Sequence, residues 1–451
     1  MLRVMITKLR IPCLAALAAA SLTANSGVAQ ESIGMVEASA PYVAPSSGVL
    51  AARRAELIDS IGAGVFFLRS SSARDLETEY LQASDFRQEN DFFFLTGIEV
   101  ADSWLLLDVR PDGESSVSLF IPERNPAREQ WTGPRPSLEM AAAITGIADV
   151  QVVAEAEPAA RAAFAHAAEA GIPVFVPQTQ WAQHDSMLQG VTSDATAEIR
   201  DAGPLVAQLR LVKDDFELEM LQRAIDITAA AQRAAMRSMR PGMYEYETEA
   251  VIEYNFRAGG AERVGFPSIV GSGPNSVVLH YDRSRRQMEA GDLVVMDIGA
   301  EYSYYTADVT RTVPVSGTFT DRQREIYNLV LASQQAGIDA VRPGATMRDV
   351  GQASREYMRD HSGDLCGSRT CDAYFIHGIG HWLGMDVHDV GNYATPFAPG
   401  MVLTVEPGIY IAEENLGVRI EDDVLVTETG SRVMSSSAPR NADEIEALMR
   451  R

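Results

Sequence analysis

Three of the seven histidines of the chain, His377, His381 and His388, fall within the twelve residues HGIGHWLGMDVH. On a β-strand they could not share one face, because position 388 differs from the other two by an odd number. The three glycines in the same stretch disfavour a regular helix. The sequence therefore predicts an irregular segment that directs several imidazoles into one cavity. Histidine is the commonest metal ligand, so the cluster indicates a site, the alternative being histidines on a surface loop.

Acidic residues accompany apolar runs on both sides of the histidine cluster. Residues 292–313 predict a hairpin in which Asp297 interrupts an apolar strand and Asp308 lies in the returning strand. Downstream, Glu406 follows another apolar run, and Glu421 lies in a second predicted returning strand. One such acid is most simply a strand-end carboxylate that faces water. Four of them around a histidine cluster predict a shared site.

Four converging carboxylates need a counter-charge. Burying an isolated charge costs several kcal/mol, and a like charge at close range adds to that cost. Two divalent cations would supply four positive charges against these carboxylates and one neutral imidazole. Oxygen-dominated ligation with one nitrogen favours Mn²⁺, with Zn²⁺ or Co²⁺ as alternatives, and argues against a thiolate zinc site.

The chain resembles the pita-bread metallopeptidases, and within them the Xaa-Pro aminopeptidase and prolidase branch. The resemblance is carried by MDIGAEYSYYTADVTRT, HGIGHWLGMDVHDVG, TVEPGIYI and GVRIEDDVLVTETG, and it covers roughly residues 50–450. It implies an α/β (α+β) fold with two domains, an amino-terminal creatinase-like domain and a carboxy-terminal pita-bread catalytic domain. The implied metal ligands are Asp297, Asp308, His381, Glu406 and Glu421. Creatinase shares the fold but lacks this metal set, which argues against a creatinase-like activity.

The resemblance also implies a division of labour among the ligands. Asp297 would bind one ion, His381 and Glu406 would bind the other, and Asp308 and Glu421 would bridge them. A hydroxide held between the two ions would attack the carbonyl of the bond that precedes proline. Glu406 would carry the proton to the leaving nitrogen.

Further residues resemble the groups that bind the substrate in this branch. His280, His377 and His388 resemble histidines that steady the tetrahedral intermediate, with satisfied structural histidines as the alternative. Tyr410 would join His377 and His388 in a pocket for the proline ring. Arg419 would orient a carboxylate or a substrate end, and a structural ion pair is the alternative.

The implied activity is that of an Xaa-Pro aminopeptidase acting on proline-containing peptides. An Xaa-Pro dipeptidase (prolidase) is an alternative, because Gly380 stands where aminopeptidases of this branch often carry serine and where prolidases also show glycine. A secreted binding protein that keeps the fold without catalysis is a third hypothesis, disfavoured by the complete ligand set. A homo-oligomer, dimer or tetramer, is also expected.

The amino terminus has the layout of a secretory signal peptide. Basic residues precede an apolar stretch from Ile11 to about Ala24, and small residues lead to a plausible cleavage point after Ala29. We therefore expect a secreted or periplasmic protein. A membrane anchor is the alternative, and the shortness of the stretch argues against it. Because the chain has a formal charge of −24, we do not expect it to bind nucleic acid or anionic membranes.

The rest of the chain predicts the following organisation. A flexible leader (30–48) precedes an amino-terminal domain (49–203) with strands at 64–68, 104–109 and 117–121 among alanine-rich helices. Gly203-Pro204 marks the boundary with the catalytic domain (204–451), which opens with an amphipathic helix pattern from residue 209. Cys366 and Cys371 remain after signal cleavage and predict a disulfide in an oxidising compartment, with free thiols as the alternative.

Overall fold

The computed structural model describes residues 43–73, 86–178, 189–192 and 196–450. The predicted signal peptide (1–29) and the leader up to residue 42 lie outside the described residues. Helix α1 (Ser47–Ile61) begins inside the predicted leader (30–48), so the last two residues of the leader are helical. The reason is local, because the Ser46 hydroxyl caps the helix by accepting a hydrogen bond from the Val49 amide.

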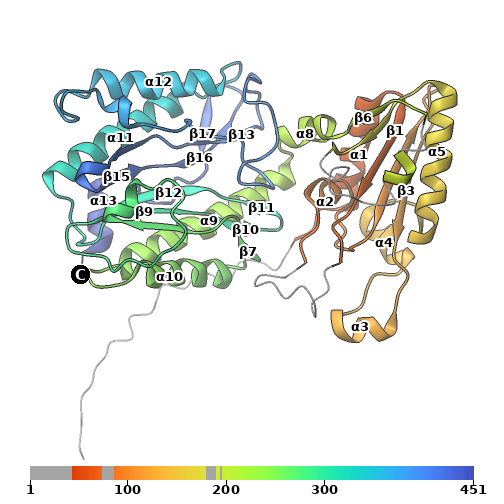
Figure 1. Cartoon of the computed structure of the whole chain (residues 1–451), viewed down its shortest axis with the longest axis horizontal. Coiled ribbons are helices and arrows are strands. Elements are labelled where there is room, and N and C mark those ends of the chain that lie inside the picture. The colour runs from red at the N-terminus through yellow and green to blue at the C-terminus, as the bar shows by residue number, and fades with distance from the viewer. Residues whose placement is uncertain (1–42, 74–85, 179–188, 193–195, 451) are drawn as a thin grey trace, which may run out of the picture. The chain divides into compact units, whose positions relative to one another are not determined.

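The first domain is built on a six-stranded mixed sheet in the order β4-β3-β2-β1-β5-β6 (Figure 1). The predicted strands are present as β1 (Gly64–Arg69), β2 (Trp104–Val109) and β3 (Ser115–Ile121). The other strands are β4 (Asp149–Val152), β5 (Val174–Val176) and β6 (Ile199–Asp201). The helices are α1, α2 (Asn90–Thr96), α3 (Pro126–Thr132), α4 (Leu138–Thr145) and α5 (Ala156–Ala170).

Both faces of this sheet are buried. Phe67 on one face of β1 packs edge-on against Phe164 of the alanine-rich helix α5, and Phe66 on the other face belongs to the core cluster that includes Leu57 of α1. Alternating side chains of a strand point to opposite faces, so an almost wholly apolar strand such as β1 is suited to this central position.

Two helices, not one, follow the predicted domain boundary. The amphipathic pattern from residue 209 divides into α8 (Gly203–Leu211) and α9 (Asp215–Ser238). The break arises because Asp214 starts a new helix with a capping box, in which Asp214 and Glu217 each accept a hydrogen bond from the other's backbone amide.

The catalytic domain contains four small sheets, in the orders β12-β9-β8, β11-β10-β7, β13-β16-β17 and β14-β15. The first hairpin is present, with β9 (Leu293–Ile298) antiparallel to β12 (Val309–Pro314) and Asp297 opposite Thr310. Its sheet is completed by β8 (Ile269–Ser272). Residues between the hairpin strands form β10 (Ala300–Tyr302) and β11 (Tyr305–Thr306), which join β7 (Arg263–Val264).

The region of the second predicted hairpin is split into more strands than the sequence pattern indicates. β13 (Val402–Val405) pairs with β16 (Asp422–Val426), which also pairs with β17 (Ser431–Val433). β14 (Gly408–Ile411) pairs with β15 (Leu416–Arg419). Glu421 therefore lies between two strands and not within one. Its backbone amide donates to the Thr310 carbonyl of β12 (3.1 Å), which joins the two hairpins at this point.

Helices enclose these sheets. α11 (Asp321–Ala340) and α12 (Met347–Asp360) pack together on one side, and α9 and α10 (Glu245–Ala258) lie on the other (Figure 1). Helix α13 (Ala442–Met449) ends the described chain, and short 3₁₀ turns cover 153–155, 273–277, 371–374 and 412–414.

The predicted disulfide between Cys366 and Cys371 is present. Among the described helices, none combines the length and apolar character of a membrane span.

Candidate metal centre and active site

The catalytic domain contains a cavity of about 650 Å³ that is lined by the predicted site residues. Tyr410 is the exception among them, because it lies behind His377 and does not line the cavity. The lining includes His280, Asp297, Asp308, His377, His381, His388, Glu406, Arg419 and Glu421. As the glycines indicate, residues 375–390 form neither a helix nor a named strand, and this irregular backbone directs all three clustered histidines to the cavity.

Four of the five predicted metal ligands are placed by the ends of strands. Asp297 is the penultimate residue of β9, and Asp308 immediately precedes β12. Glu406 immediately follows β13, and Glu421 immediately precedes β16. His381 is held by its own backbone, whose amide donates to the Thr404 hydroxyl of β13 (3.2 Å).

Asp308, His381 and Glu421 form the tightest part of the cluster. They offer ligand atoms that all lie within 4.8 Å of one another, and all three residues are buried. His381 Nε2 is 3.3 Å from Asp308 Oδ2 and 3.8 Å from Glu406 Oε1. Because Nδ1 of the same ring lies 3.0 Å from the Trp382 carbonyl, Nδ1 is assigned the proton and Nε2 is left as the lone-pair donor.

The carboxylates meet a chemical test for cation binding. Oδ1 of Asp297, Oδ1 of Asp308 and Oε1 of Glu421 are buried oxygens without a hydrogen-bond partner among the described residues. Burial, followed by the charge of Asp297, raises the pKa of Asp308 well above its usual range. Burial and then the charge of Asp308 raise the pKa of Glu421 in the same way. A divalent cation would satisfy these oxygens and offset their repulsion, so the donor set fits a metal centre.

Asp297 is also tied to a chain of polar side chains that ends at His377. Arg419 Nη2 donates to Asp297 Oδ2 (2.6 Å), and Arg419 Nη1 donates to the Tyr410 hydroxyl (3.0 Å). The same hydroxyl lies 2.8 Å from His377 Nε2. Arg419 therefore orients a predicted ligand. Burial, and after it the charge of Arg419, lowers the pKa of His377 to about 4, which leaves this imidazole neutral near pH 7.

His388 and His280 lie at the open side of the cavity. The His388 ring stacks on that of His381 at a centroid distance of 4.0 Å. Partial burial, followed by the charges of His381 and His280, lowers the pKa of His388 to about 4. The next residue, Asp389, is buried and pairs with Lys213 Nζ (2.9 Å) and Arg210 Nη2 (2.5 Å). These ion pairs anchor the turn that carries His388.

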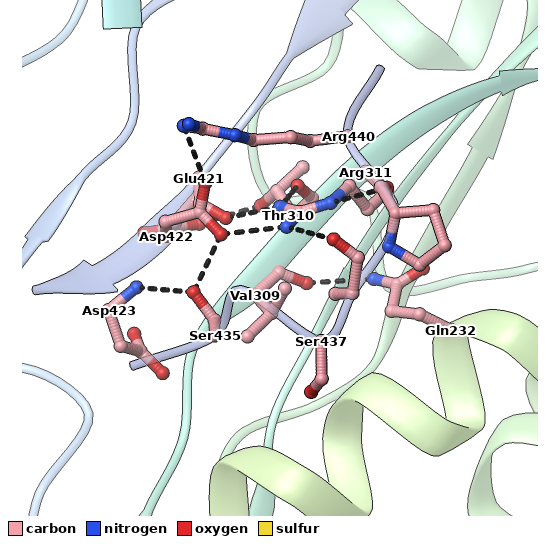
Figure 2. A network of polar contacts seen from close by, with 12 residues as sticks. Gln232, Val309, Thr310, Arg311, Glu421, Asp422, Asp423, Ser435, Ser437 and Arg440 are labelled. Atoms are coloured by element: carbon pink, nitrogen blue, oxygen red, sulfur yellow. Dashed lines mark hydrogen bonds and ion pairs between the residues drawn. The ribbon is translucent and has the colours of Figure 1, made fainter. Parts of the chain in front are cut away.

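A buried polar network beneath the metal ligands was not anticipated from the sequence (Figure 2). Its centre is Arg311, which is completely buried on β12. All five of its N–H groups are used. Nε donates to the Pro439 carbonyl, Nη1 to the carbonyls of Thr310 and Glu421, and Nη2 to Asp422 Oδ1 and the Ala438 carbonyl. Asp422 also accepts from the Ser435 hydroxyl (2.6 Å).

The network acts directly on the two predicted bridging ligands. The Thr310 hydroxyl donates to Glu421 Oε2 (2.6 Å), and the Asp308 amide donates to Asp423 Oδ2 (3.2 Å). A signal was present in the sequence, because an arginine within the otherwise uncharged run VTRTVP requires buried partners. The acids of the motif IEDD supply one of them.

Comparisons with known proteins agree with this architecture. A model of metallopeptidase family M24 matches residues 219–428, and a model of the aminopeptidase P N-terminal domain matches residues 50–170. The chain is 34% identical over 435 residues to the Xaa-Pro aminopeptidase of Escherichia coli strain K12, covering 88% of this chain and 96% of that protein.

Solved structures with the same fold come from other bacteria. Aminopeptidase PepP of Pseudomonas aeruginosa superposes with a TM-score of 0.82 at 31% identity, covering 90% of this chain and 98% of that one. Proline aminopeptidase P II of Yersinia pestis gives a TM-score of 0.81 at 31% identity, covering 90% and 99%. The predicted two-domain α/β fold is therefore confirmed, and the chain belongs to metallopeptidase family M24, with an amino-terminal domain of the aminopeptidase P type.

Proposed function

We propose that the protein is an Xaa-Pro aminopeptidase, which removes the first residue from peptides whose second residue is proline. The observation that carries the proposal is a cavity in which the five predicted metal ligands lie beside His280, His377 and His388. Relatives that cover most of the chain bear the name Xaa-Pro aminopeptidase.

The predicted ligands would hold two divalent ions. When bound, such ions supply Lewis acidity toward a peptide carbonyl and lower the pKa of a coordinated water. Mn²⁺ is our proposed ion, because carboxylate oxygens dominate the donor set, with Zn²⁺ and Co²⁺ as the alternatives.

The remaining side chains of the cavity perform the binding and proton-transfer steps. Glu406 Oε2 lies 3.7 Å from His377 Nδ1, and burial raises the pKa of Glu406 to about 7. We assign Glu406 the proton that moves to the leaving proline nitrogen. His377, held by Tyr410, and His388 flank the position for the proline ring, and His388 donates a hydrogen bond toward the reacting carbonyl.

The dipeptidase alternative loses its main support. A Cβ atom at Gly380 would lie 2.0 Å from the Thr404 carbonyl oxygen, so this backbone admits only glycine. Glycine at this position is thus explained by its packing against β13 and is not by itself evidence for a dipeptidase.

The cellular setting is part of the same proposal. The amino-terminal sequence supports secretion or a periplasmic location, where the enzyme would act on peptides outside the cytoplasm. We also propose a homo-oligomer, dimer or tetramer, which light scattering on the mature protein would test.

A metal-reconstituted assay tests the function. The metal-free protein, supplied with Mn²⁺, Zn²⁺ or Co²⁺ in turn, is given Xaa-Pro dipeptides, Xaa-Pro-Xaa tripeptides and matched peptides without proline. We expect turnover of the tripeptides. Turnover of dipeptides alone would assign the protein as a prolidase, and equal turnover of peptides without proline would refute both assignments. Metal binding without any peptidase activity would support the third hypothesis, a binding protein.

A further inference from the structure

A groove of about 630 Å³ runs along α12 and adjoins the catalytic cavity. Gly378, Gly380 and Tyr393 line both hollows. Gly378 is exposed, and a Cβ atom there would meet no other atom within 4 Å. The groove is therefore within reach of a peptide that leaves the cavity beside Gly378.

The groove carries positive charge in a strongly acidic protein. Arg348, Arg355 and Arg359 of α12 line it, and Glu356 is the acidic residue among its lining. The whole chain has a formal charge of −24. The local excess of guanidinium groups makes this groove complementary to a carboxylate.

Two of the three arginines have structural partners. Arg355 donates from Nη2 to the His377 carbonyl and from Nη1 to the Phe375 carbonyl, each at 2.7 Å. Arg359 pairs with Asp372 at 3.1 Å. The guanidinium of Arg348 has no hydrogen-bond or ion-pair partner within the described parts of the chain.

Helix stability does not account for Arg348. It is the second residue of α12, and a positive charge in the first turn opposes the helix dipole. Its side chain is exposed, so replacing it should leave the fold intact. The guanidinium acts electrostatically on the neighbouring Asp349 but is exposed, so it can also meet a ligand.

We propose that the α12 groove binds the part of the substrate that follows proline, and that Arg348 selects peptides with a carboxylate there. The inference rests on the proposed aminopeptidase function and adds to it a preferred substrate class, peptides with an acidic residue downstream of proline. The first residue and the proline occupy the catalytic cavity, and the next residues extend past Gly378 and Tyr393 along α12.

The test uses amidated peptides of the series Ala-Pro-Ala-Z-Ala, in which Z is Asp, Asn or Lys and the amide removes the terminal carboxylate. For the wild-type enzyme we expect kcat/KM to fall in the order Asp, Asn, Lys, mainly through KM. An exposed ion pair gives about a two- to fivefold effect per charge, and high salt should reduce it. Arg348→Ala should remove the preference for Asp, and Arg348→Glu should reverse it.

Arg342→Ala is the matched control, because Arg342 is exposed, precedes the same helix and does not line the groove. It should keep the wild-type order. Turnover of amidated Ala-Pro-Ala should change little in every variant, since this peptide carries no downstream charge for Arg348 to meet. Equal kcat/KM for Asp and Lys in the wild type, or an unchanged order in Arg348→Glu, would overturn the inference while tripeptide turnover upholds the aminopeptidase function. No turnover of any peptide in the series, tripeptide included, would overturn both.

Discussion

Arg311 offers the sharpest test of how the metal centre is supported. The change Arg311→Met removes the guanidinium but keeps an unbranched apolar side chain on β12. It leaves the carboxylate of Asp422 buried without the ion pair that now joins Arg311 Nη2 and Asp422 Oδ1 at 2.7 Å, with both side chains fully buried. Breaking a buried pair in this way typically costs ~3–5 kcal/mol of unfolding free energy.

The remaining partners of Asp422 set the expected value within that range. Its carboxylate still accepts from Ser435 (2.6 Å) and Gln334 (3.1 Å), so we expect a loss near the lower end, about 3 kcal/mol. The measurement is urea denaturation of the metal-free protein, so that metal binding does not contribute. Metal content of the folded, reconstituted variant is measured separately, and we expect it to fall because Arg311 also holds the Glu421 carbonyl.

Two further variants isolate the buried pair. Arg440→Met removes a partly exposed arginine 3.6 Å from the same carboxylate and should cost less than about 1 kcal/mol. Arg311→Met combined with Asp422→Asn should be less destabilised than the sum of the single changes, because no unpaired charge remains. A single Arg311→Met variant with the stability and metal content of the wild type would refute the role given to this network.

Three other predictions concern the site and the folded state. Asp308→Ala should lose metal and activity together, and a variant with two bound ions at a normal rate would remove the ligand assignment. His388→Ala should keep its metal content but lose turnover on the order of 10²-fold, and loss of metal would instead make His388 a ligand. Burial raises the pKa of Glu217 from 4.5 to about 7. Between pH 4.5 and about 7, Glu217 therefore keeps its proton in the folded protein, whereas the unfolded chain has released it. The protonated Glu217 therefore stabilises the folded state at low pH, and this stabilisation is lost as the pH rises through 7. Glu217→Gln can keep the helix cap and should flatten the pH dependence of stability, measured in thermal melts across pH 5–8.

The sequence could predict those features that depend on local pattern. Three of the six strands of the first domain (β1, β2 and β3), the first carboxylate hairpin and the disulfide are each indicated by short-range periodicity or spacing, and the structure contains them. The site residues were predicted from motif resemblance, and the structure gathers them around one cavity.

Features that depend on contacts between distant segments were not predicted. The break at residues 212–214 is a different case, because its cause is the local capping box of Asp214 and Glu217, which the longer amphipathic pattern outweighed in the prediction. The position of Glu421 outside any strand follows from its hydrogen bond to β12, and the role of Arg311 follows from partners near residues 310, 422 and 439. No local pattern encodes such pairings, because they arise only when the two hairpins meet.

The junction at Glu421 links metal uptake to chain assembly. Thr310 and Glu421 are 111 positions apart in the sequence, yet one hydrogen bond joins their side chains. A growing or partly folded chain cannot present the complete set of predicted ligands until both hairpins have docked, so we expect cation binding to come late in folding and to draw on the stability of the whole domain. The rate at which a fluorescent chelator strips the ions should therefore follow the opening of the two hairpins, which makes metal release a direct reporter of motion between them.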